Sequence, residues 1–125
     1  MNQSVSDAAA ARAEATLVLA QNALEDGKAV DVRVLPVAHM TTITDYMVVA
    51  SGRSVRQVKA LTERLRESVK NSGLEILGVE GEQAAEWVLV DLGDVIVHLM
   101  QAETRDFYQL EKLWDGEPQS DLESG

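Results

Sequence analysis

Residues 86–100 read EWVLVDLGDVIVHLM, a sequence that predicts a β-hairpin. Two apolar runs, 86–90 and 95–100, flank a short segment that contains two acids and a glycine. β-Branched and aromatic residues favour strands, and Gly93 can supply the positive φ that a two-residue hairpin loop requires. The stretch therefore predicts two neighbouring antiparallel strands.

A two-residue loop in this hairpin would place Asp91 opposite Asp94 at its end. In the same register Trp87 faces His98, and cross-strand partners of this kind share one face of a sheet. The two carboxylates would then be about 5 Å apart, close enough to bind a divalent metal. The alternative is that Asp91 starts the turn and that both acids face solvent.

Apolar segments upstream of the hairpin predict three more strands. Residues 30–34 alternate valine with charged side chains, which is typical of a half-buried strand, and Pro36 would end it. Residues 46–50 form a continuous apolar run that predicts a central strand. Residues 74–79 predict a short strand before the hairpin.

Helical spacing of apolar residues predicts a helix near each end of the chain. Asp7 can cap the first helix, which would run to about Asp26 and stop before Gly27. Thr104 can cap the last helix. The apolar side of this last helix would carry Phe107, Leu110 and Trp114.

A third helix, in the middle of the chain, has the clearest end signals. Ser54 and Gln57 form a capping-box pattern, and Gly73 would end the helix. Spacing predicts a buried face of Val55, Val58, Leu61 or Thr62, Leu65 and Val69.

Six of the eleven basic residues lie on or beside this middle helix. They are Arg53, Arg56, Lys59, Arg64, Arg66 and Lys70. They indicate either a second, smaller contact surface or a set of intramolecular ion pairs.

The mixture of helices and short strands predicts an α/β fold with a single mixed β-sheet flanked by helices. At 125 residues the chain is expected to form one domain, over residues 7–114. Residues 1–6 are polar, and residues 115–125 carry four acids and no basic residue. Both ends are expected to be disordered tails.

The net charge of −10 excludes several classes of function. Nucleic-acid and membrane binders usually need a basic surface, so the natural partner is a basic protein surface, without direct nucleic-acid specificity. With no cysteine and two histidines, neither a metal nor a cofactor is expected. No apolar run reaches the roughly 20 residues of a membrane helix, and the first residues lack a signal-peptide pattern, so a cytoplasmic location is expected.

Acidic residues dominate residues 72–104, a segment with no lysine or arginine. The acids around the hairpin are Glu80, Glu82, Glu86, Asp91 and Asp94. They form either an ordinary solvated face or a surface complementary to a basic partner, where such charges set association rate and register.

Three ring-bearing residues near the hairpin have two interpretations each. Trp87 either packs in the core or serves as a partly exposed interface anchor, a role in which tryptophan is enriched. Tyr108 is one position off the apolar side of its helix, which favours exposure at a contact surface. His98 lies within an apolar strand, which favours a packed, hydrogen-bonded histidine over a general base.

Five blocks of the sequence carry a resemblance to a known family. They are TDYMVV (44–49), SGRSVRQV (51–58), GVEG (78–81), WVLVDLGDVIVH (87–98) and, after Arg105, YQLEKLW (108–114). In this order they resemble the ribosomal silencing factor family RsfS, also called Iojap-like proteins. The resemblance covers roughly residues 17–114.

The resemblance implies a nucleotidyltransferase-like topology without catalytic residues, and hence no enzyme. It implies a homodimer that binds large-subunit ribosomal protein fourteen and sterically blocks association of the small and large ribosomal subunits, which represses translation under nutrient limitation. Charge and expected exposure select the partner-binding residues within the matched blocks: Glu80, Trp87, Asp91, Asp94 and Tyr108.

Two other functions compete with this interpretation. A metal-dependent nucleotidyltransferase would bind Mg²⁺ at Asp91 and Asp94 and hold a triphosphate at residues 51–56. Such enzymes usually present Asp-x-Asp on one strand, whereas this chain has Asp-x-x-Asp across a turn. A large-subunit assembly factor would use the same surface and differ only in when it acts.

Overall fold

The computed structural model describes the backbone of residues 3–114 and the side chains of residues 7–106 and 108–112. The elements are α1 (Gln3–Asp26), β1 (Val30–Pro36), β2 (Tyr46–Gly52), α2 (Val55–Ser72), β3 (Gly78–Glu80), β4 (Trp87–Asp91), β5 (Val95–Gln101), α3 (Ala102–Tyr108) and α4 (Leu110–Trp114). None of the helices in this part of the chain has the length and apolar character needed to cross a membrane.

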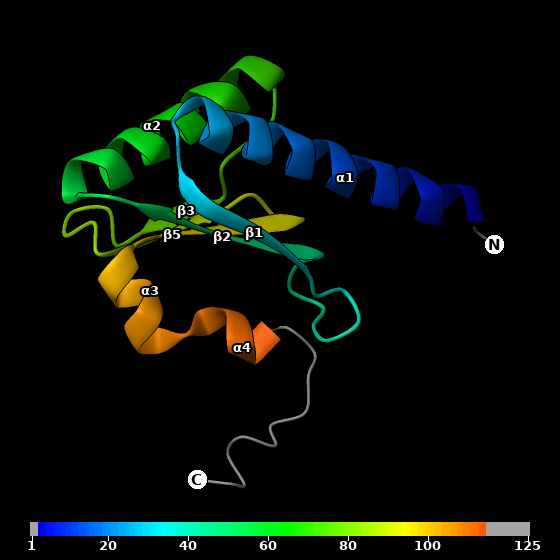
Figure 1. Ribbon diagram of the computed structural model, residues 1–125. Coiled ribbons are helices and arrows are strands. Elements are labelled where there is room, and N and C mark those ends of the chain that lie inside the picture. Colours follow the sequence, from blue (N-terminus) through cyan, green and yellow to red (C-terminus); the bar gives the residue numbers. More distant parts are fainter. Residues whose placement is uncertain (1–2, 115–125) are drawn as a thin grey trace, which may run out of the picture.

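The five strands form one mixed sheet in the order β1-β2-β5-β4-β3. The central pair, β2 and β5, is parallel, and the other neighbours are antiparallel. Helices α1 and α2 cover one face of the sheet, and α3 and α4 lie against the other (Figure 1). The predicted α/β fold with a helix-flanked mixed sheet is confirmed.

The alternation of side chains along the strands builds two separate cores. The larger core lies between the sheet and helices α1 and α2, where fully buried valines of β2, β4 and β5 pack against Leu24, Leu61 and Leu65. The smaller core lies on the α3 and α4 side. Its buried members are Leu35, Val37, Met47, Val49, Met100 and Leu110.

Helix α2 is capped as predicted at both ends. The Ser54 hydroxyl accepts a hydrogen bond from the Gln57 amide at 3.1 Å, and Gly73 adopts the left-handed conformation with φ 84°. The buried face contains Val58, Leu61, Thr62, Leu65 and Val69. Val55, also predicted for this face, is exposed instead because it occupies the first turn, outside the sheet contact.

The β4–β5 turn lies one residue further along the chain than predicted. The Leu92 amide donates to the Val95 carbonyl at 2.9 Å, so the two loop residues are Gly93 and Asp94. Gly93 has φ 89°, the positive value expected of it. Strand pairing consequently shifts by two residues, and because side chains alternate with a period of two, every residue keeps its predicted face.

Three other predicted boundaries were wrong. Helix α1 begins at Gln3, inside the predicted tail, because the alanine-rich residues after Asp7 favour helix and extend it backwards. Strand β3 is shorter than the predicted 74–79 because its pairing with β4 begins only at Gly78. Thr104 lies inside α3, which follows β5 directly. The predicted tail 115–125 and the side chains of Phe107 and Trp114 lie outside the described residues.

Candidate docking surface

Strands β3 and β4 bring acidic and aromatic side chains to one face of the sheet. Trp87, Leu89 and Asp91 occupy alternate positions of β4 and therefore share the face on which α3 and α4 lie. Glu80 of β3 pairs with Leu89 and has the same orientation. Together with Tyr108 of α3, these residues form a surface that we call the acidic–aromatic face.

Trp87 is the centre of this face. It packs on the smaller core, as one of the two interpretations predicted, and stays partly exposed, while its role as an interface anchor stays a prediction. Its indole Nε1–H donates to His98 Nδ1 at 3.0 Å. The Tyr108 ring lies 5.0 Å from it at an interplanar angle of 49°, and Tyr108 is 54% exposed. The aromatic pair is thus rigid on one side and open to solvent on the other.

His98 fixes the orientation of the Trp87 ring through their hydrogen bond. It was predicted to face Trp87 directly, but it pairs with Leu89 and reaches Trp87 diagonally across the strands. Burial lowers the pKa of His98 to about 4, so the imidazole is neutral near pH 7. Because Nδ1 accepts from Trp87, the proton is assigned to Nε2, which has no hydrogen-bond partner within the described part of the chain. A packed, hydrogen-bonded histidine is what the structure shows.

The stability of the fold is expected to fall with acidification because of His98. The folded pKa of about 4 lies below the ordinary 6.5, so the unfolded chain binds the proton more readily between these values. The stability that the buried neutral imidazole contributes is fully present above pH 6.5. As the pH falls toward 4, the free energy of unfolding decreases by up to about 1.4 kcal/mol per pH unit. Urea unfolding of the wild type and of His98→Gln between pH 5 and 6.5 checks this. Parallel slopes for the two proteins would contradict it.

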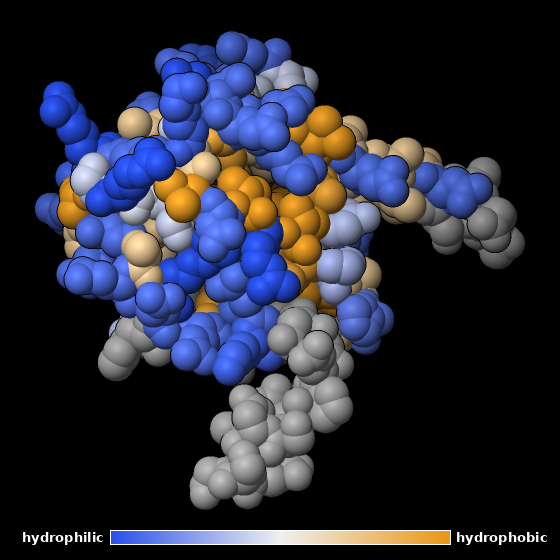
Figure 2. All heavy atoms as spheres, in the orientation of Figure 1, coloured by the Kyte–Doolittle hydropathy of each residue, from blue (hydrophilic) through white to orange (hydrophobic). Residues whose placement is uncertain are grey.

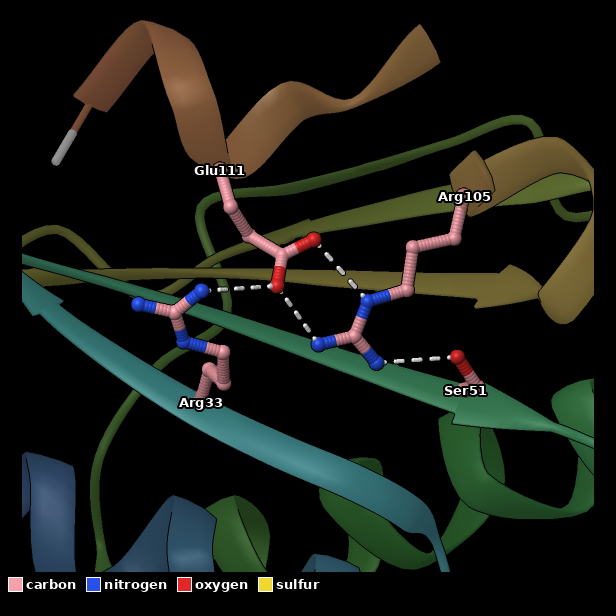
Figure 3. A network of polar contacts seen from close by, with 4 residues as sticks. All are labelled: Arg33, Ser51, Arg105 and Glu111. Atoms are coloured by element: carbon pink, nitrogen blue, oxygen red, sulfur yellow. Dashed lines mark hydrogen bonds and ion pairs between the residues drawn. The ribbon is translucent and has the colours of Figure 1, made fainter. Parts of the chain in front are cut away.

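A partly buried ion-pair network holds the helix that carries Tyr108 (Figure 3). The Arg105 guanidinium donates to both carboxylate oxygens of Glu111, at 3.0 and 2.9 Å, and to the Ser51 hydroxyl at 2.9 Å. Arg33 of β1 reaches the same carboxylate at 3.4 Å. The hydrogen bonds from Arg105 hold the pKa of Glu111 below its usual range. This arrangement ties α3 and α4 to β1 and β2.

The break between α3 and α4 makes the network possible. Gln109 adopts a left-handed conformation with φ 49°, and its amide donates to the Arg105 carbonyl. The chain then turns so that Glu111, six residues after Arg105, meets its side chain. Sequence reasoning missed this pair because six residues is not a helical contact spacing, and no glycine or proline marks the break.

The predicted pairing of Asp91 with Asp94 was wrong. Asp91 pairs with Ile96 in the sheet, and its carboxylate accepts from the Gly93 amide at 2.9 Å. Asp94, in the loop, forms an ion pair with Arg12 of α1 at 3.2 Å. Four of the five predicted binding residues therefore belong to the acidic–aromatic face, and Asp94 lies apart from it, beside α1.

This geometry does not support the Asp91–Asp94 metal site on which the alternative of a metal-dependent enzyme depends. The two aspartates have different partners, Gly93 and Arg12, and in the described part of the chain no three carboxylate or imidazole groups cluster as metal ligands. The serines of the proposed phosphate cradle are also engaged. Ser51 accepts from Arg105, and Ser54 caps α2.

Comparisons with known proteins agree with one another. The family model "Ribosomal silencing factor during starvation" matches residues 10–125. A Zymomonas mobilis protein named ribosomal silencing factor RsfS is 43% identical over 108 residues, covering 86% of this chain and 81% of the relative. A crystal structure of a Chromobacterium violaceum protein superposes with a TM-score of 0.81 at 44% identity, covering 84% of this chain and 88% of that one. A mouse protein named mitochondrial assembly of ribosomal large subunit protein 1 is 37% identical over 94 residues, covering 73% of this chain and 41% of the relative.

Proposed function

This chain belongs to the ribosomal silencing factor family, and on that premise we propose that it represses translation by docking on large-subunit ribosomal protein fourteen. Bound there, it blocks association of the small and large ribosomal subunits by occupying the surface at which they meet. The mechanism needs no reaction and no cofactor. Repression under nutrient limitation and a cytoplasmic location belong to the same proposal.

The acidic–aromatic face is the observation that carries this proposal. Glu80 and Asp91 share the sheet face of the Trp87–Tyr108 pair, and no lysine or arginine occurs between residues 72 and 104. Partly exposed tryptophan and tyrosine rings suit the energetic centre of an interface, and carboxylates on the same face suit a basic partner. The rings would supply most of the affinity, while the carboxylates set register and association rate.

Sedimentation of purified ribosomal subunits with and without the protein tests the proposal. We expect the protein to comigrate with large subunits and the fraction of joined ribosomes to fall as the protein is added. A protein of similar size and charge that lacks an aromatic face serves as the control for ionic effects. If subunit joining is unchanged and nothing comigrates, the proposal is wrong.

The proposal includes a homodimer, as the family resemblance implies. The edge strand β3 has three residues, and the nearby Leu77 side chain is 64% exposed, which offers apolar surface to a second copy. Light scattering over a range of concentrations would measure the mass. A mass of one chain at all concentrations excludes the dimer.

A role in assembly of the large subunit is the second candidate, and the name of the mouse relative favours it. The same face would then be used on a maturing particle. Precursor particles that accumulate in a deletion strain would support an assembly role. A normal particle profile together with impaired survival of starvation would support silencing alone.

A further inference from the structure

Cations without ion-pair partners gather at the start of α2, away from the acidic–aromatic face. Arg53, Arg56 and Lys59 are all exposed, and no ion pair of the described residues involves them. The chain carries no acid between Arg53 and Thr62. We call these three residues the basic patch.

In the second half of α2, the charge of Arg66 is neutralised within the molecule. Arg66 donates twice to Glu82, at 2.6 Å each, and once to Glu63 at 2.5 Å. The hydrogen bonds from Arg66 lower the pKa of Glu82. Lys59 lowers it further through a weaker electrostatic attraction to the same carboxylate. Intramolecular pairing therefore accounts for the charge on Arg66 and leaves the basic patch available.

The surroundings of the patch preserve its positive charge. Gln57 donates to the Lys28 carbonyl at 2.9 Å, so Lys28 lies beside the patch as a further cation. The neighbouring end of α1 carries the acids Glu25 and Asp26. With Glu82, which attracts Lys59, four cations face three acids here, although the chain as a whole has a net charge of −10. Within a screening length of about 8 Å, the local charge governs what can bind.

The basic patch adjoins the end of the sheet, along the strand direction, at which Trp87 lies. Gly52, at the end of β2, pairs with Gln101 of β5, and Trp87 pairs with the preceding Met100. Two strand spacings, roughly 10 Å, separate β2 from β4. Helices α2 and α3 both begin at this end (Figure 1), and mostly hydrophilic residues cover it in the same view (Figure 2). A partner bound to Trp87 would bring its surroundings within reach of Arg53.

We propose that the basic patch binds the phosphate backbone of ribosomal RNA next to the protein on which the acidic–aromatic face docks. The inference rests on the proposed function, since it takes the large subunit as the target. Charge complementarity selects the occupant: exposed arginine and lysine side chains neutralise phosphates without reading sequence. Because the chain is acidic overall, we expect it not to bind isolated RNA. The basic patch contributes only after the acidic–aromatic face has docked.

The test compares charge-removing variants of the full chain on purified large subunits over a range of salt concentrations. A triple variant should show two effects; it carries Arg53→Gln, Arg56→Gln and Lys59→Gln. The slope of log affinity against log salt concentration should become smaller in magnitude by about 2 to 3, and the affinity at 150 mM salt should fall on the order of tenfold. Arg56→Gln and Lys70→Gln form a matched pair, with equal charge change on the same helix. Only Arg56→Gln should reduce the slope, by about 1. Thermal unfolding checks that each variant is folded.

A parallel measurement with isolated ribosomal protein fourteen distinguishes the outcomes. The triple variant should bind the isolated protein as the wild type does. Equal weakening on both targets would overturn the inference and assign the patch to an acidic protein surface. Unchanged binding to both would overturn it as well while the proposed function stands. A wild type that binds neither target contradicts the proposed function itself.

Discussion

Replacing Trp87 with alanine is expected to weaken binding to the large ribosomal subunit by about 2 kcal/mol or more, roughly 30-fold in Kd. The ring system is held by the smaller core, by the hydrogen bond to His98 and by Tyr108, so its exposed part is already ordered before binding. A preorganised aromatic anchor loses little entropy on docking, which is why its removal costs more than that of a mobile side chain. Titration calorimetry or sedimentation binding measures the change.

Two control variants separate binding from folding in this experiment. Trp87→Phe keeps the packing and loses the indole N–H, so its affinity should lie between those of the wild type and the alanine variant. Val18→Ala truncates an exposed apolar side chain of α1, whose exposed fraction is 52%, and should leave affinity unchanged. An alanine variant at Trp87 that unfolds like the wild type and binds equally well would remove Trp87 from the interface.

Replacing Gly81 with alanine is expected to destabilise the fold by about 3 kcal/mol, from backbone strain and steric overlap together. Gly81 has φ 80°, a conformation that costs an L-residue about 1–2 kcal/mol. An added Cβ would also overlap the backbone carbonyl oxygen of Trp87, which a side-chain rotation cannot relieve. The segment between β3 and β4 must therefore move, and Trp87 with it. Urea denaturation measures the stability, and subunit binding by this variant should fall in parallel.

Gly73 provides a matched control for the steric overlap of the added Cβ. Its φ is 84°, nearly that of Gly81, but a Cβ at this position meets nothing within 4 Å. Gly73→Ala should thus cost only the conformational term, about 1 kcal/mol. If the two alanine variants lose equal stability, the steric overlap at Gly81 contributes nothing and the expectation for that position is wrong.

Local signals in the sequence predicted most of the elements. The alternation of residues 30–34, the capping pattern at Ser54 and the stop at Gly73 each depend on residues within one turn or strand, and each is present in the structure. The faces of Trp87 and His98 were also predicted, although their register was not. The loop could be placed at either of two adjacent dipeptides, and both choices give the same alternation.

Features that depend on distant partners could not be predicted. Asp94 is drawn away from Asp91 by Arg12, 82 residues earlier in the chain. The Arg105–Glu111 pair requires the left-handed Gln109, a conformation that no neighbouring residue marks. The acidic–aromatic face could be predicted in part because Trp87 and Asp91 alternate along one strand, whereas Tyr108 joins them only through the packing of α3 on the sheet.

The separation of unpaired cations at the start of α2 from acids on β3 and β4 has a consequence for diffusion. Besides its net charge, the molecule carries a permanent electric dipole, and such a molecule experiences a torque in the field of a charged target. Rotation can then precede contact, so that a larger share of collisions occurs in a productive orientation. The arrangement of the same residues, at constant net charge, would thereby set how fast the protein finds its site.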